Sequence, residues 1–181
     1  MVAVASQNEG MRYVALLRAI NVGTANRVKM ADLVVALEAN GIEGATTYLQ
    51  SGNVLFKWEK SIDSADQAFD HALADLGLKS TVILRTADQM TKVAARKVLE
   101  DRKEPGKTQF VTFLKDPFNG ELQSGEASEI LLRTPTEIYW VATPREGKAP
   151  TGPKLPKEVI AQSTNRNWIV TRALADLLRR S

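Results

Sequence analysis

Residues 12–18, RYVALLR, are typical of a β-strand that is apolar on both of its faces. Tyr13 and Leu17 would lie on one face of that strand and Val14 on the other, because side chains alternate along a strand. A strand of this kind lies inside a sheet and is covered on both sides. Residues 108–115, TQFVTFLK, repeat the pattern. The chain must therefore cover both faces of two separate strands, which favours a layered fold of helices and sheets.

The first half of the chain is predicted to follow a β-α-β-β-α-β order, which is the ferredoxin-like pattern. The predicted elements are strand 12–18, helix 30–40, strands 45–50 and 53–58, a helix ended by Gly77, and strand 80–85. Ser51-Gly52 predicts a two-residue turn between the middle strands. Ser64, with Gln67 three residues later, predicts a capping box at the start of the second helix.

The rest of the chain repeats this order of elements without repeating the residues. Thr86 and Gln89 predict a second capping box, which opens a helix at 87–101. The later predicted elements are strand 108–115, a short helix or loop at 117–126, a hairpin of strands 129–134 and 137–142, a short helix at 155–161, a short strand near 163–168 and a final helix at 168–180.

We therefore expect an α+β fold of two ferredoxin-like (α/β-plait, βαββαβ) halves packed together in one chain. The charged segment 101–107, DRKEPGK, is the expected linker between a first half at 11–100 and a second half at 108–181. Residues 1–10 lack periodicity, and we expect a disordered extension there. Each sheet would leave one apolar face open, which the other half or a second copy in a homodimer would cover.

The composition excludes several classes of site. The chain has no cysteine and a single histidine, so zinc, haem and iron–sulfur centres and cysteine nucleophiles are not expected. We expect no cofactor and no metal, and His71 is expected on the surface of the second helix. No apolar run approaches the roughly 18 residues of a membrane span, and no secretory signal is recognisable. We therefore expect a cytoplasmic protein without a membrane partner.

Three short segments are recognisable together. They are RYVALLRAINVG (12–23), TYLQSGNVLF (47–56) and TNRNW (164–168). In this order and spacing they resemble an uncharacterised bacterial family, the domain of unknown function 1697, over nearly the whole chain. The chain departs from the family pattern at Ala19 and Thr24, where the family usually has glycine. The resemblance implies two α/β-plait halves, and it implies no activity.

The loop 18–29 joins the first strand to the first helix and is the main candidate site. Its candidate ligand-binding residues are Arg18, Asn21, Gly23, Arg27 and Lys29. A helix start offers unpaired N–H groups and the positive end of the helix dipole, which suit an anion such as a nucleotide or nucleic-acid phosphate. The loop matches neither a Walker loop nor a G-x-G-x-x-G fingerprint. In the alternative interpretation, Asn21 and Gly23 only shape a turn, and the basic side chains are solvated.

The other two segments add further candidates. Ser51 and Asn53 flank the hairpin glycine and would bond a ligand or simply build the turn, since no G-x-S-x-G elbow surrounds the serine. Arg166 would pair with a phosphate or carboxylate of a ligand, or form a structural salt bridge. Asn167 is a candidate N-cap of the final helix, and Trp168 is expected to anchor the core rather than to stack on a base.

Two features bear on nucleic-acid binding. The loop 143–157 is rich in Pro and Gly, and its charged residues give a net +3, equal to the formal net charge of the whole chain. These residues are Arg145, Glu146, Lys148, Lys154 and Lys157. The loop would act as an electrostatic arm, as a lid, or as an ordinary solvated loop. Tyr13 and Phe56 would be the base-stacking residues of an RNA-recognition fold, but a strand covered on both faces argues against that role.

Three hypotheses for the function follow. The first is a non-enzymatic binding protein for an anionic ligand, a nucleotide or nucleic acid, at the first strand-to-helix loop. The second is an enzyme of unknown chemistry that acts on a small polar substrate. Its pocket would combine Arg18, Asn21, Ser51, Asn53 and Arg166. The third is a structural or oligomerising protein without a small ligand. The first two require that the three segments converge on one cleft.

Overall fold

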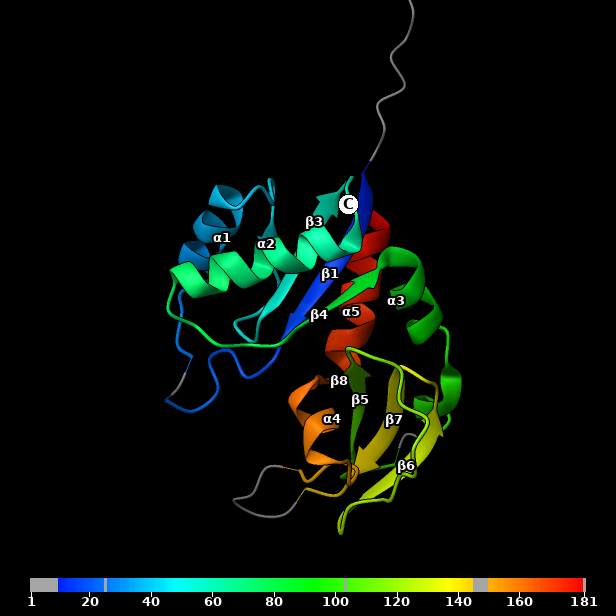
Figure 1. Ribbon diagram of the computed structural model, residues 1–181. Coiled ribbons are helices and arrows are strands. Elements are labelled where there is room, and N and C mark those ends of the chain that lie inside the picture. Colours follow the sequence, from blue (N-terminus) through cyan, green and yellow to red (C-terminus); the bar gives the residue numbers. More distant parts are fainter. Residues whose placement is uncertain (1–9, 25, 103, 145–149, 181) are drawn as a thin grey trace, which may run out of the picture.

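The computed structural model describes residues 10–24, 26–102, 104–144 and 150–180. It is an α+β fold with two four-stranded antiparallel sheets (Figure 1). The elements of the first half are β1 (Met11–Leu17), α1 (Met30–Ala39), β2 (Thr46–Thr47), β3 (Asn53–Trp58), α2 (Ile62–Asp75) and β4 (Val82–Thr86). Those that follow are α3 (Ala87–Ala94), a short 3₁₀ helix (Lys97–Leu99), β5 (Thr108–Leu114), β6 (Ser128–Arg133), β7 (Glu137–Ala142), α4 (Lys157–Ala161), β8 (Ser163–Asn167) and α5 (Trp168–Arg180).

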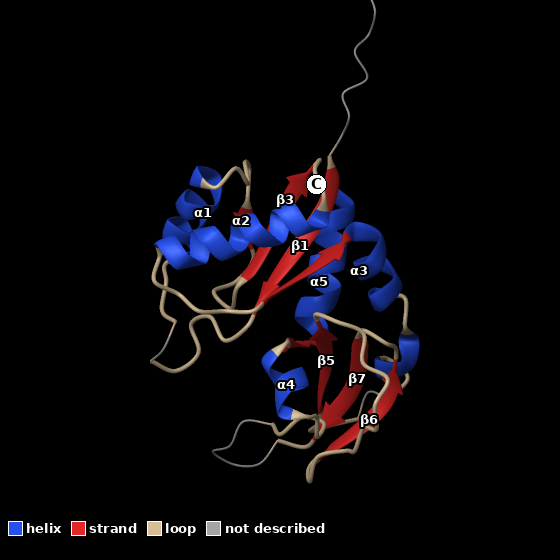
Figure 2. Ribbon diagram, viewed as in Figure 1, coloured by secondary structure: helices blue, strands red, loops and turns tan. Residues whose placement is uncertain are grey.

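The first sheet has the strand order β2-β3-β1-β4, so β1 lies between two antiparallel neighbours. Tyr13 and Leu17 belong to one core, together with Leu33 of α1 and Phe69 of α2. Val14 belongs to a different core on the opposite face. The predicted central strand, apolar and covered on both sides, is therefore confirmed. Figure 2 shows α1 and α2 on the same side of this sheet.

The second sheet has the order β6-β7-β5-β8 and follows the first in its strand arrangement, but not in its helices. Residues 117–126 contain no helix, so the loop alternative of the prediction holds there. α4, at five residues, is short. One face of the sheet carries Trp140, which packs with Phe118 of that loop and Leu155 before α4. Loops thus cover a face that long helices cover in the first half.

A single apolar core joins the two halves. Its members come from both sheets and from the helices between them: Val14, Leu16, Ile83, Met90, Val111, Phe113, Tyr139, Trp168, Leu174 and Leu178. α5 runs alongside both sheets and packs on α3 (Figure 1). Each large apolar side chain that is fully buried in such a core stabilises the fold by about 1.5–3 kcal/mol. α3, together with α5 and the second sheet, therefore covers the face of the first sheet that α1 and α2 leave open.

A buried ion pair also crosses between the halves. Arg85 on β4 lies with its Nε 3.0 Å from Oε1 of Glu137 on β7, and both side chains are at most a tenth exposed. The Arg85 Nη2 donates to the Leu114 carbonyl at 2.7 Å. The other carboxylate oxygen of Glu137 accepts from the hydroxyls of Thr134 at 2.7 Å and Thr136 at 3.1 Å. Because both charges are bonded on several sides, removal of either partner would leave the other uncompensated.

The predicted two-residue hairpin is wrong in its details. β2 contains only Thr46–Thr47, and the connection to β3 spans residues 48–52. The Asn53 side chain donates to the Tyr48 carbonyl at 2.8 Å, while the Tyr48 N–H donates to the Asn53 carbonyl at 2.9 Å. These bonds close a wider loop in place of a tight turn.

The helix starts were predicted with mixed success. The N-cap of α2 is Ser61, whose side chain accepts from the Ser64 N–H, so the predicted cap at Ser64 is three residues too late. The capping box of Thr86 and Gln89 is confirmed by reciprocal bonds of 3.1 and 2.9 Å. The helix that it opens ends at Ala94, earlier than expected, and the 3₁₀ helix follows.

Some predictions fall on parts of the chain that the structure does not describe. The expected extension at 1–10 lies outside the described residues except for Gly10, and so do Arg145 and Lys148 of the basic loop. Within the described ranges, no helix combines the length and the apolar character that crossing a membrane requires.

Candidate functional site

The three polar segments converge where β1 ends and the two halves meet. Arg18 follows β1, Ser51 lies in the loop before β3, and Arg166 lies on β8 of the second half. The Arg18 Nη1 donates to the Ser163 carbonyl at 2.7 Å, and the Arg166 Nη2 donates to the Ser51 carbonyl at 3.1 Å. The first two functional hypotheses require the three segments to converge, and in the structure these segments lie together.

Arg166 is buried and bonded to neutral groups throughout. Its Nε donates to Oδ1 of Asn53, and its Nη2 donates to the carbonyls of Leu17 at 3.0 Å and Gly52 at 3.1 Å. Its Nη1 donates to the Thr164 hydroxyl at 2.8 Å. Burial lowers the pKa of this guanidinium to about 10, which still leaves it charged near neutral pH. Among the described residues Arg166 forms no ion pair, so it makes neither a structural salt bridge nor an exposed anion site.

Asn53 and Ser51 belong to the same bonded cluster. Asn53 is fully buried, and its Nδ2 donates to the Ser51 Oγ at 3.1 Å. No histidine or carboxylate bonds that hydroxyl within the described part of the chain, so nothing there activates Ser51 as a nucleophile. The side chains of Asn53 and Arg166 therefore serve to position the loop before β3.

Asn21 closes the loop between β1 and α1 with its own amide group. The Asn21 Nδ2 donates to the carbonyls of Val28 at 3.0 Å and Gln50 at 2.9 Å, and its Oδ1 accepts from the Val28 N–H at 2.9 Å. Asn21 also has a φ of 55°, in the left-handed region that asparagine tolerates better than most residues. The turn interpretation thus accounts for this side chain.

The remaining loop candidates lie toward solvent. Gly23 has a φ of 65°, and a β-carbon at this position would meet nothing within 4 Å. The Arg27 Nε donates to the Gly23 carbonyl at 3.1 Å. Arg27 and Lys29 are exposed. Lys29 occupies the N-cap position of α1 and makes no side-chain capping bond. These residues do not line either hollow that Arg18 lines.

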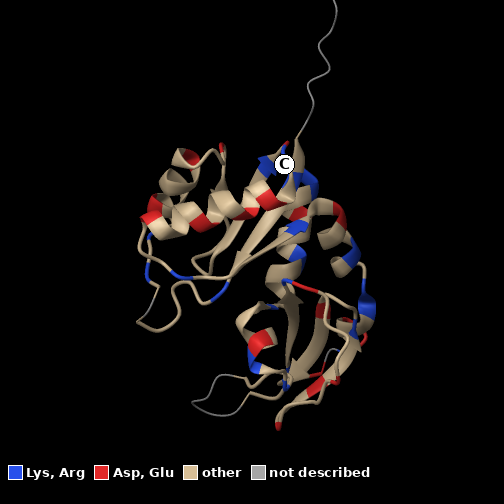
Figure 3. Ribbon diagram, viewed as in Figure 1, with Lys and Arg blue, Asp and Glu red and all other residues tan. Residues whose placement is uncertain are grey.

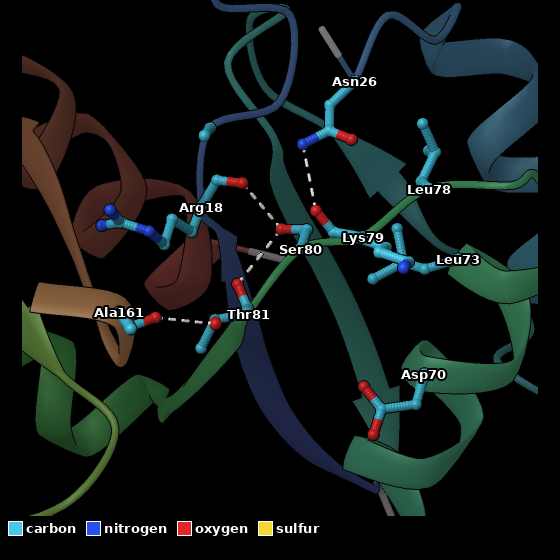
Figure 4. Close-up of a pocket in the computed structure, with 10 residues that line it drawn as sticks. Arg18, Asn26, Asp70, Leu73, Leu78, Lys79, Ser80, Thr81 and Ala161 are labelled. Carbon is cyan, nitrogen blue, oxygen red and sulfur yellow. Dashed lines mark hydrogen bonds between the residues drawn. The ribbon is translucent and has the colours of Figure 1, made fainter. Parts of the chain in front are cut away.

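Arg18 borders a hollow of about 640 Å³, shown in Figure 4. The β1–α1 loop, α2, the α2–β4 connection and the end of α4 form its walls. Its polar lining residues are Arg18, Asn26, Asp70, Lys79, Ser80 and Thr81. In this view Arg18 and Asp70 stand on opposite sides, with Ser80 and Thr81 between them.

A second hollow, of about 380 Å³, also has Arg18 in its wall. The loop at Ser51 and the end of β8 at Asn165 and Arg166 contribute to it. Arg18 is thus the predicted site residue that the structure places in both hollows. Its side chain is half-buried and forms no ion pair with any described residue.

Asp70, Lys79, Ser80 and Thr81 were not among the predicted site residues. The signal for most of them was present in the predicted element order, because an antiparallel neighbour of β1 must begin where β1 ends. The Arg18 N–H does donate to the Thr81 carbonyl, at 2.9 Å. Asp70 gave no such signal, since its position on an amphipathic helix is typical of a solvated residue.

The other candidates from the sequence lie elsewhere. His71 is exposed on α2. Tyr13 and Phe56 are buried and stack on each other with ring centroids 5.5 Å apart, so neither presents a face to a nucleic-acid base. Trp168 is buried, and Asn167 caps α5 by accepting from the Val170 N–H at 2.8 Å. The described residues contain no group of three or more side chains that would hold a metal ion.

A family model described as a protein of unknown function (DUF1697) matches residues 11–139. No curated protein matches. Among solved structures, the conserved bacterial protein SP0830 from Streptococcus pneumoniae is similar, with 18% identity and a TM-score of 0.63, over 94% of this chain and 99% of that chain. At that identity the similarity shows a shared fold and nothing of function.

Proposed function

This chain belongs to the DUF1697 family, whose description assigns no activity, and we propose that it binds a small anionic ligand in the hollow beside Arg18. One observation carries the proposal. The Arg18 guanidinium is half-buried at the junction of the halves, and within the described residues only its Nη1 makes a side-chain bond, to the Ser163 carbonyl. An arginine has five N–H donors, so most of its donors remain for a ligand.

The charge around Arg18 supports an anion. Lys79 lines the same hollow and forms no ion pair with a described residue. Figure 3 shows basic residues on the loops at this end of the first half, whereas the acidic residues of that half gather on α1 and α2. Two cations in the wall of one hollow act on the same bound group, and they attract an anion more strongly than either charge would alone.

The size of the hollow favours a small ligand over nucleic acid. A volume of about 640 Å³ lies in the range of small-molecule sites, roughly 300–1,000 Å³. A nucleic-acid interface would need a continuous basic stripe, and Arg27 and Lys29 do not line the hollow. A nucleotide or a molecule of similar size is therefore the favoured ligand.

We also infer that each half is a version of the ferredoxin-like plait and that the halves divide at 101–107. The strand orders β2-β3-β1-β4 and β6-β7-β5-β8 support this inference, since the same order occurs twice. The second half lacks the helix between its first two strands, so it would be a reduced version of the pattern.

Isothermal titration calorimetry at low salt tests the binding proposal. The probes are AMP, inorganic phosphate and a single-stranded oligonucleotide. We expect AMP to bind, and we expect Arg18→Gln and Lys79→Gln each to weaken it about tenfold, which corresponds to about 1.4 kcal/mol. Arg180→Gln, at the exposed end of α5, is the matched control and should change nothing. Undetectable binding of every probe would refute the proposal, and selective binding of the oligonucleotide would replace it with a nucleic-acid function.

A further inference from the structure

The hollow beside Arg18 contains a carboxylate that an anion site does not need. Asp70 lies on α2, and Figure 4 shows its side chain at the edge of the hollow, across from Arg18. Two other aspartates of the same helix have partners: Asp66 pairs with Lys115 at 2.7 Å, and Asp75 accepts from the Asn40 Nδ2 at 3.0 Å. Asp63 and Asp70 are both exposed, and only Asp70 lines the hollow. The Asp70 side chain has no such partner among the described residues, so its oxygens remain available as acceptors.

The hydroxyl groups between Arg18 and Asp70 have already used their hydrogens. The Ser80 Oγ donates to the Arg18 carbonyl at 2.8 Å, and the Thr81 Oγ1 donates to the Ala161 carbonyl at 2.9 Å (Figure 4). A hydroxyl has one hydrogen and two lone pairs. Both oxygens therefore face a ligand only as hydrogen-bond acceptors.

Asn26 adds another acceptor on the same wall. Its Nδ2 donates to the Lys79 carbonyl at 3.0 Å, which leaves its Oδ1 as the group without a bond to a described residue. The hollow thus has cationic donors at Arg18 and Lys79, and acceptors at Asn26, Asp70, Ser80 and Thr81. A bare anion would use only the donors and leave the acceptors to water, whereas a ligand that also carries hydroxyl groups would form hydrogen bonds with both sets.

We propose that the ligand is a polyhydroxylated anion of the sugar phosphate class, with its phosphate at Arg18 and Lys79 and its hydroxyl groups at Asp70. Sugar hydroxyls supply the donors that the acceptors lack, and a carboxylate is well suited to receive them. Leu73 and Leu78 in the wall offer apolar contact to the carbon skeleton. This proposal rests on the proposed function and narrows it to one chemical class.

The test compares two phosphate esters that differ in their hydroxyl groups. Ribose 5-phosphate and methyl phosphate are titrated into the full chain by calorimetry. We expect ribose 5-phosphate to bind at least fivefold more tightly. Asp70→Asn should remove most of that difference and leave the methyl phosphate affinity unchanged or slightly higher. Asp63→Asn, an exposed aspartate at the start of the same helix, is the matched control and should have no effect.

The outcomes separate this proposal from the one it rests on. If neither ester nor AMP binds, the anion site itself is refuted. If both esters bind equally and Asp70→Asn changes nothing, the anion site stands and the hydroxyl-recognition proposal is wrong. Tighter binding of 2-aminoethyl phosphate than of ribose 5-phosphate would also overturn it, because Asp70 would then recognise an ammonium group. Urea unfolding of each variant shows whether a lost affinity comes from a lost fold.

Discussion

Arg166 of the second sheet donates its Nε to Oδ1 of Asn53 of the first, and both side chains are buried. The same guanidinium reaches the Leu17, Ser51 and Gly52 carbonyls. The Arg166 side chain therefore donates hydrogen bonds from the opposite half of the molecule to backbone carbonyls at the end of β1 and in the loop before β3. All of these acceptors are neutral, so the role of Arg166 is to hold the end of β1 and the loop before β3 in place.

Arg166→Met should destabilise the protein by about 3 kcal/mol. Methionine fills a similar volume but leaves buried carbonyl groups without donors, and each such group costs about 1–3 kcal/mol. The measurement is the free energy of unfolding in urea. Arg172→Met is the control, because Arg172 is half-exposed and pairs with Glu100 on the surface. A surface ion pair of this kind contributes about 1 kcal/mol or less to the free energy of unfolding. Equal effects of the two substitutions would contradict the role assigned to Arg166.

Gly52 and Gly23 offer a second matched pair. Both have positive φ, 74° and 65°. A β-carbon at Gly52 would lie 2.9 Å from the Leu17 Cβ and 3.1 Å from the Ile20 Cβ, whereas one at Gly23 would meet nothing within 4 Å. We expect Gly23→Ala to cost about 1 kcal/mol, for backbone strain alone. Gly52→Ala should cost at least about 2 kcal/mol, since overpacking adds to the strain. Thermal unfolding distinguishes the two, and equal costs would show that the Gly52 loop can shift.

The sequence predicted the features that depend on burial along one element. β1 was predicted as a central strand because both of its faces are apolar, and apolar side chains on both faces of a strand must be buried on both sides. The hairpin was predicted less well, because Asn53 bonds the Tyr48 carbonyl and widens the loop. The pattern of residue types along a hairpin does not show that a side chain, such as that of Asn53, will form a hydrogen bond that closes the loop. Ser64 was mistaken for the cap in place of Ser61 for a related reason: either serine suits the position, and the geometry after β3 decides.

The residues of the proposed site could be named from the sequence where a single loop supplies them, and could not be named where tertiary contacts bring them in. Arg18 was found as a charge at the end of a strand. Lys79 and Asp70 approach it only because β4 pairs with β1 and α2 packs across the sheet. The sequence left the role of Arg166 open between a ligand contact and a salt bridge, because charge is visible in a sequence, whereas the backbone carbonyls that Arg166 binds are not.

Ala19→Gly should raise the free energy of unfolding by about 0.5–1 kcal/mol. Ala19 has a φ of 52°, a conformation that costs a residue with a β-carbon about 1–2 kcal/mol and costs glycine almost nothing. Part of the gain is offset because glycine makes the unfolded chain more flexible. Ala74→Gly, in the exposed part of α2, is the control and should lower stability, as glycine does within helices. A loss of stability in Ala19→Gly would mean that the alanine methyl group makes a compensating contact.

Tyr139 should make the protein sensitive to alkali. Burial, and then the charge of Glu137, raise the pKa of its phenol above the ordinary value near 10. Between that value and the higher folded pKa, the unfolded chain loses the proton while the folded chain keeps it. The stability present below pH 10 is therefore lost as the pH rises. From pH 9 to pH 11, wild type should lose about 1 kcal/mol more than Tyr139→Phe in urea unfolding. Tyr48→Phe, at a partly exposed tyrosine, is the control, and parallel curves for wild type and Tyr139→Phe would show that the phenol ionises in the folded protein.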